Sequence, residues 1–122
     1  MDPPRGAGAD CPRLHEQLPD DLDGRDRRDT SPASRRTAAW GDPALVLRCG
    51  VTRPAGLTAT SQVLEVDEVE WFLAERPGAY VFTTVGRRAY VELRVPRPTP
   101  RDRATAPLVD LAPAITAAVP RT

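Results

Sequence analysis

Hydrophobic and polar positions alternate most regularly over residues 79–95 (AYVFTTVGRRAYVELRV). This period of two is typical of β-strands, and glycine at Gly86 suits a two-residue turn with Arg87. The predicted cross-strand pairs are Val85 with Arg88, Thr84 with Ala89, Phe82 with Val91, and Tyr80 with Leu93. Since this register places the apolar side chains of both strands on one face, the segment is predicted to be a β-hairpin.

A further strand is predicted over residues 44–49 (ALVLRC), with Leu45, Leu47 and Cys49 on one side. The preceding Trp40-Gly-Asp-Pro43 has the composition of a turn. Residues 50–61 contain proline and glycine and are expected to be a loop.

Residues 62–73 (QVLEVDEVEWFL) fit two structures. A hairpin turning at Asp67–Glu68 would pair Val66 with Val69 and Leu64 with Trp71, at the cost of placing Glu65 opposite Glu70. A helix capped by Asp67 would instead use Glu70 in a capping box. The pattern favours the hairpin and leaves the helix open.

Two segments have helical spacing. In the first, residues 10–18, Asp10 is a candidate cap and Cys11, Leu14 and Leu18 share one face. In the second, Thr105 is a candidate cap, Pro107 fits the first turn and Pro120 ends the helix. Its apolar stripe consists of Leu108, Leu111, Ile115 and Val119.

The chain is expected to fold in its last two thirds, because apolar residues are sparse over residues 1–37 and make up nearly half of the remainder. The predicted division is a disordered leader at 1–9, a docked helix at 10–19, a charged linker at 20–37 and an α+β domain at 38–122. The predicted fold is a small antiparallel sheet, one strand plus two hairpins, with an N-terminal and a C-terminal helix.

Charge and composition exclude several classes of protein. The chain has 122 residues, with 17 basic and 17 acidic side chains and a formal net charge of zero, which argues against a globally basic nucleic-acid binder. No apolar run is long enough to span a membrane. All basic residues are arginine and asparagine is absent, a bias that fits a GC-rich genome.

Cys11 and Cys49 are the only cysteines, and spacing alone leaves two possibilities, a disulfide or two reduced core residues. Cys11 and His15 are four residues apart on one helix face, which could present a thiolate–imidazole pair. The sequence offers no further metal-ligand spacing, phosphate loop or serine-nucleophile motif, so no metal, cofactor or catalytic residue is predicted.

Six residues form a possible binding surface. A basic stretch over residues 87–103 could bind an anionic ligand, with an aromatic ring on the same face, and a tryptophan beside a rigid turn could add a patch. These residues are Trp40, Asp42, Arg87, Arg88, Tyr90 and Arg94. The alternative is that the arginines pair with the acidic residues at 65–75 or stay solvated, and that Trp40 packs in the core.

Several short segments, in this order, carry a family resemblance: Cys11-Pro-Arg-Leu14, Ala39-Trp-Gly-Asp-Pro43, Leu47-Arg-Cys-Gly50, Val63-Leu-Glu-Val66, Trp71-Phe72, Thr83-Thr-Val-Gly-Arg87, Tyr90-Val-Glu92 and Val95-Pro96. Together the chain resembles the actinobacterial domain-of-unknown-function family 3515 over residues 10–120. Members are usually exported or membrane-attached, so the resemblance implies an extracytoplasmic protein and a Cys11–Cys49 disulfide. This chain has no hydrophobic N-terminal segment, so its export signal would lie upstream of Met1; otherwise the protein is cytoplasmic.

The expected function is that of a non-enzymatic cell-envelope domain that binds a protein or a cell-wall component, with no specific nucleic acid as partner. The alternatives are a small enzyme using Cys11 with His15, and an anionic-ligand binder using the arginines at 87–103.

Overall fold

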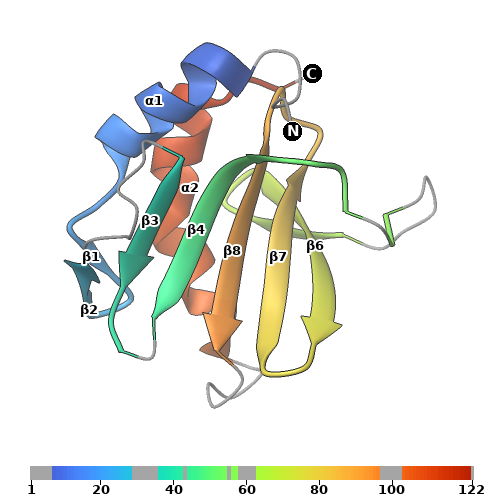
Figure 1. The fold of residues 1–122 in the computed structure, drawn as a ribbon. Coiled ribbons are helices and arrows are strands. Elements are labelled where there is room, and N and C mark those ends of the chain that lie inside the picture. The colour runs from blue at the N-terminus through green and yellow to red at the C-terminus, as the bar shows by residue number, and fades with distance from the viewer. Residues whose placement is uncertain are drawn as a thin grey trace.

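The computed structural model describes residues 7–28, 36–42, 44–54, 56–57, 63–96 and 103–121, with side chains from Asp10 onward. These residues form two helices and eight strands, arranged as Figure 1 shows. The elements are α1 (Ala7–Gln17), β1 (Asp21–Leu22), β2 (Arg25–Arg28), β3 (Thr37–Trp40), β4 (Leu45–Val51), β5 (Leu64–Val66), β6 (Val69–Arg76), β7 (Ala79–Val85), β8 (Tyr90–Pro96) and α2 (Ala106–Ala118). The predicted leader at 1–9 lies mostly outside the described residues, and its last three residues begin α1.

The strands form one antiparallel sheet in the order β1-β2-β3-β4-β8-β7-β6-β5. The α+β class is confirmed, but the predicted sheet of one strand plus two hairpins is too small. The additional strands are β1, β2 and β3, which extend the sheet on the side of β4.

The linker predicted at residues 20–37 is wrong where the structure describes it, because β1 and β2 lie there and β3 begins at Thr37. Asp23 and Gly24 have positive φ angles and join the first two strands. Leu22 is fully buried and anchors this edge in the core. β2 lies between the two-residue edge strand β1 and β3, and charged side chains near a sheet edge discourage pairing with other chains, so low apolar content did not exclude a strand.

The turn predicted at Trp40-Gly-Asp-Pro43 lies between β3 and β4, although Pro43 itself is outside the described residues. Gly41 has φ +77° and its amide donates to Asp26 O at 2.9 Å. A Cβ atom there would lie 2.6 Å from Arg25 Cδ, so both the backbone conformation and the space require glycine.

The hairpin interpretation of residues 62–73 is confirmed where it is described, and the helix is wrong. β5 and β6 pair Leu64 with Trp71, Glu65 with Glu70 and Val66 with Val69, the register predicted from the sequence. Asp67 and Glu68 both have positive φ, 49° and 72°, as a two-residue type I′ turn requires.

The hairpin of β7 and β8 is confirmed, but its register differs from the prediction by two residues. Phe82 pairs with Leu93 and Tyr80 with Val95, so the connection is longer than the predicted Gly86–Arg87 turn. The longer loop has its own hydrogen bonds, because Val91 N donates to Thr84 Oγ1 at 2.9 Å. A shift of two keeps every side chain on its predicted face.

Both helices pack on one face of the sheet and share a single core with it (Figure 1). The apolar stripe of α2 is confirmed, and its four members are fully buried. Thr105 does occupy the cap position, but its side chain makes no capping hydrogen bond. Asp10, predicted to cap α1, instead lies inside it, because α1 begins at Ala7.

Candidate functional site

The predicted binding surface does not exist as one surface. Trp40 is fully buried, and its Nε1 donates to Pro19 O at 3.0 Å. The guanidinium carbon of Arg27 lies 5.4 Å from the centre of the Trp40 ring, a cation–π contact. Trp40 therefore packs in the core, as the alternative interpretation predicts. Asp42 is exposed on the turn after β3, and its Oδ1 lies 3.9 Å from Arg28 Nη1.

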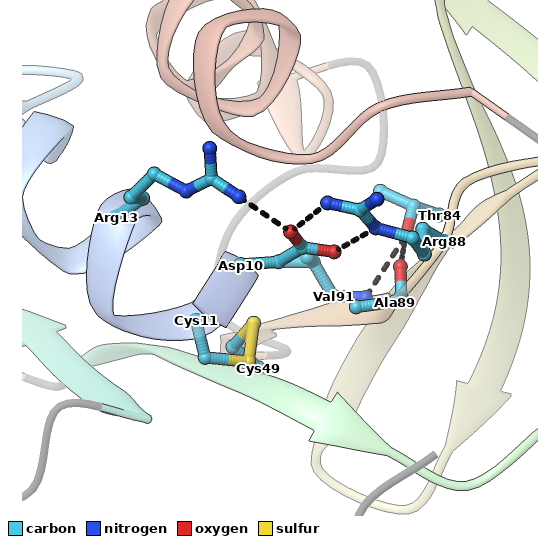
Figure 2. Close-up of a disulfide and its surroundings, with 8 residues drawn as sticks. All are labelled: Asp10, Cys11, Arg13, Cys49, Thr84, Arg88, Ala89 and Val91. Atoms are coloured by element: carbon cyan, nitrogen blue, oxygen red, sulfur yellow. Dashed lines mark hydrogen bonds and ion pairs between the residues drawn. A yellow bond between two sulfur atoms is a disulfide. The ribbon is translucent and has the colours of Figure 1, made fainter. Parts of the chain in front are cut away.

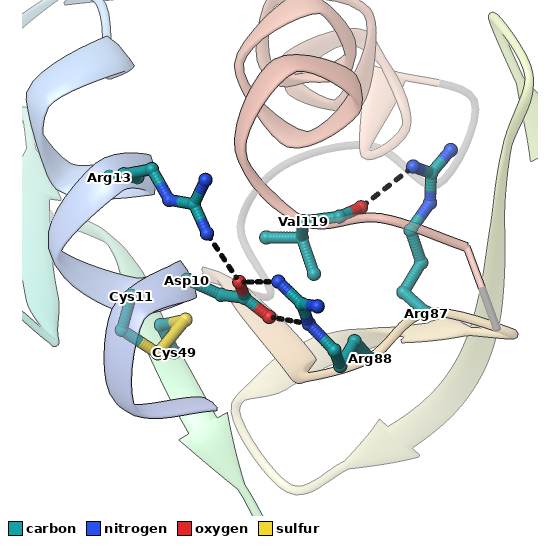
Figure 3. A network of polar contacts seen from close by, with 7 residues as sticks. All are labelled: Asp10, Cys11, Arg13, Cys49, Arg87, Arg88 and Val119. Carbon is teal, nitrogen blue, oxygen red and sulfur yellow. Dashed lines mark hydrogen bonds and ion pairs between the residues drawn. A yellow bond between two sulfur atoms is a disulfide. The ribbon is translucent and has the colours of Figure 1, made fainter. Parts of the chain in front are cut away.

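Arg87 points into the molecule, between the turn after β5 and the end of α2. Its Nη1 donates to Val119 O at 2.9 Å (Figure 3). Its Nη2 donates to Glu68 O at 3.2 Å. Burial lowers the pKa of Arg87, and the nearby Arg121 lowers it further. This guanidinium holds the C-terminal end of α2 and is only 8% exposed, which leaves little of it for a ligand.

Arg88 is also bound within the fold, to the fully buried carboxylate of Asp10. Its Nε and Nη2 donate to Oδ2 and Oδ1 at 2.8 and 2.6 Å, a bidentate pair across 78 residues of sequence (Figure 2). Arg13 Nη2 adds a third contact to Oδ1 at 3.2 Å. The hydrogen bond from Arg88 lowers the pKa of Asp10 although burial opposes it, and the same bond raises the pKa of Arg88.

Cys11, the residue after Asp10, lies at disulfide distance from Cys49 in β4, with Cα atoms 5.6 Å apart (Figure 2). The disulfide implied by the family resemblance thus agrees with the structure. Cys11 has no thiol in this state, so it cannot form the thiolate–imidazole pair with His15. His15 Nε2 instead lies 3.1 Å from Arg27 Nη2, and the ring is half-buried rather than solvated.

Tyr90 and Arg94 lie on the face of the sheet opposite the helices, which we call the open face. Along β8 the side chains alternate, with Val91, Leu93 and Val95 buried in the core. The other positions point outward, and Arg94 is exposed. Within the described part of the chain, Arg94 makes no hydrogen bond or ion pair.

The neighbours of Arg94 on the open face come from β4 and β7. Val46 and Val81 are its cross-strand partners, and both are half-buried. Arg48, opposite Glu92, is 59% exposed and its Nη1 lies 3.6 Å from Glu92 Oε2. This group, the Arg94 patch, consists of Val46, Arg48, Val81, Glu92 and Arg94.

Arg53, Gly56 and Leu57, described residues after β4, lie at one end of the open face. Arg53 Nη1 donates to Tyr90 Oη at 3.5 Å and its Nη2 to Leu57 O at 3.2 Å. A Cβ atom on Gly56 would lie 3.5 Å from the ring of Phe72 in β6. Tyr90 therefore serves as an attachment point for these residues, and the uncovered part of the face is centred on Arg94.

The candidate surface predicted from the sequence includes Arg94 but not Val46, Arg48, Val81 or Glu92. Val46 and Arg48 alternate with Leu45, Leu47 and Cys49, so the period-two pattern places them on the opposite side of the strand. This pattern would place them beside Arg94 if the pairing of β4 with β8 were known. Arg97 and Arg101, the other members of the basic stretch, lie outside the described residues, and Arg103 is exposed before α2.

Over the residues that the structure describes, no three His, Cys, Asp or Glu side chains gather as metal ligands would. In the same part of the chain, no helix has the length and apolar character needed to cross a bilayer.

Fold and contacts together define a small α+β domain in which a disulfide and a half-buried ion pair attach the N-terminal helix to an antiparallel sheet. The chain belongs to the family described as "Protein of unknown function (DUF3515)", whose sequence profile matches residues 1–122. No curated protein and no solved structure matches the chain.

Proposed function

We propose that this protein is a non-enzymatic domain of the cell envelope that binds a partner through the open face of its sheet. The observation that carries the proposal is the Arg94 patch. Here an exposed arginine, unpaired within the described chain, stands between two half-buried valines at the centre of the sheet. An apolar and charged surface of this kind is typical of protein binding sites.

The disulfide and the contacts of two arginines support this proposal over the alternatives. Disulfides persist in oxidising compartments, so the Cys11–Cys49 pair fits a location outside the cytoplasm. The same pair removes the thiol that an enzyme using Cys11 and His15 would need. Of the arginines considered for anion binding, Arg87 and Arg88 are bound within the fold.

Site-specific photo-crosslinking in intact cells of the source organism tests the proposal. A benzophenone amino acid replaces Val81 in the Arg94 patch or, as a matched control, Val109, which is 49% exposed on α2. We expect a discrete crosslinked product from position 81, absent from position 109 and lost when R94E is added. Identical products from both positions, or none from position 81, would contradict it.

A further inference from the structure

The charges of the Arg94 patch do not balance. Arg48 and Arg94 contribute two positive charges, and Glu92 contributes one negative charge. Among the described residues, the carboxylate of Glu92 lies close to Arg48 and forms no ion pair with Arg94. Glu92 is also only 20% exposed, whereas Arg48 is 59% exposed. The Arg94 patch therefore presents a net positive charge, which is complementary to carboxylates on a partner.

The apolar part of the patch restricts the partner further. Val46 and Val81 flank Arg94 in one cross-strand row, with neighbouring strands roughly 4.8 Å apart. Covering these valines is most favourable when the partner places apolar side chains over them, because polar groups in that position would themselves lose hydration. A purely anionic polymer has none, so the surface favours a protein segment.

The register gives the spacing of the two arginines. Arg48 pairs with Glu92, which is two residues from Arg94 on β8, so Arg48 and Arg94 are diagonal neighbours at roughly 7–8 Å. In an extended chain, side chains two residues apart lie on one side at about 6.7 Å. Two acidic residues separated by one residue can therefore reach both arginines at once.

We infer that the occupant of the Arg94 patch is an extended acidic segment of another protein, with two carboxylates in alternate positions followed by an apolar side chain. This inference rests on the proposed function and specifies the partner class for the same surface. Arg94 would supply the unpaired cation, Arg48 the second one, and Val46 with Val81 the apolar contact.

Fluorescence anisotropy with defined peptides tests this inference on the oxidised full chain. The probe is a fluorescein-labelled dodecapeptide with the repeat Glu-Ser-Glu-Ser-Val-Ser. We expect it to bind, and we expect a peptide with Gln in place of every Glu to bind at least tenfold more weakly. R94E should weaken binding of the Glu peptide at least tenfold and R94Q less, whereas R103E, a matched reversal outside the sheet, should leave it unchanged.

Three results would overturn the inference. If a Ser-for-Val peptide bound as well as the probe and polyphosphate displaced it, the ligand would be an anionic polymer. If R94E and R103E had equal effects, the peptide would bind elsewhere. Crosslinking from Val81 without peptide binding would reject the acidic segment and leave the proposed function standing, so the two failures are distinguishable.

Discussion

Asp10 shows how a single charged residue can connect distant parts of a small fold. It is fully buried, yet it accepts three hydrogen bonds from two arginines, one on its own helix and one from the loop between β7 and β8. Buried carboxylates are tolerated when they are paired and hydrogen-bonded in this way. Its position at the start of a helical pattern predicts a helix cap. Aspartate is used both in helix caps and in long-range ion pairs, so the sequence does not distinguish the two roles.

Substitution of Asp10 by Asn should lower the free energy of unfolding by about 2 kcal/mol, because hydrogen bonds to a charged partner are lost while the side-chain shape is kept. Chemical denaturation of the oxidised protein at neutral pH measures this change. D42N is the matched control, since Asp42 is exposed and its contact with Arg28 is 3.9 Å long; it should change stability by less than about 0.5 kcal/mol. Equal effects of both substitutions would contradict the structural role of Asp10.

The same residue predicts an acid sensitivity. The pKa of Asp10 is lowered in the folded state, chiefly by the hydrogen bond from Arg88, so its carboxylate stabilises the fold above its ordinary pKa. That contribution should be lost as the pH falls from about 4 through the lower folded-state pKa. Denaturation between about pH 5 and pH 2 should therefore show a steeper loss of stability in the parent protein than in D10N.

At the scale of elements, the turn of the β5–β6 hairpin is conformationally unfavourable for its residues. Asp67 and Glu68 both occupy the left-handed region, which costs a non-glycine residue roughly 1 kcal/mol. E68G should therefore stabilise the protein by about 0.5–1 kcal/mol, since the Glu68 carbonyl that accepts from Arg87 and Arg121 is retained.

Thermal and chemical denaturation check this prediction, with E65G as the control. Glu65 is exposed in β5, where glycine should weaken the strand instead. A loss of stability in E68G similar to that in E65G would show that the Glu68 side chain matters more than its backbone conformation.

The hairpins also show what a sequence pattern can and cannot predict. The β5–β6 register followed from its hydrophobic pattern, although the turn contains no glycine. In the β7–β8 hairpin the faces were correct and the register was not, because a shift of two leaves the pattern unchanged. The extra loop residues depend on tertiary partners, since Arg88 N donates to Pro120 O from the far end of the chain.

For the whole molecule, the disulfide should decide whether α1 stays attached. In the loop-entropy model, closing a loop of this length contributes roughly 4 kcal/mol. Reduction or a C11A/C49A double substitution should therefore destabilise the protein by up to about 4 kcal/mol, with hydrogen exchange increasing first in α1.

Mass spectrometry after alkylation without reductant provides the matching check on protein from its native source. No alkylated cysteine is expected at Cys11 or Cys49. Two alkylated thiols would contradict both the disulfide and the oxidising location it supports.

The candidate site was less predictable than the fold. Arg87, Arg88 and Arg94 lie close together in the sequence and carry the same charge, but Arg87 and Arg88 bind partners within the fold and Arg94 is exposed. Local sequence cannot show which of the three arginines has a partner within the fold, because the partners of Arg87 and Arg88 lie at the end of α2 and in α1. Arg94 was assigned correctly to the open face because strand alternation alone determines it.

The Cys11–Cys49 bond also has a mechanical consequence. When the chain is pulled from its two ends, the segment between these cysteines cannot extend while the bond is intact. The bond spans 38 positions of sequence, so at roughly 3.5 Å per residue it removes about 130 Å from the length that the unfolded chain can reach. Tension would therefore reach the sheet from β4 onward, while β1, β2 and β3 remain in a loop that bears no load.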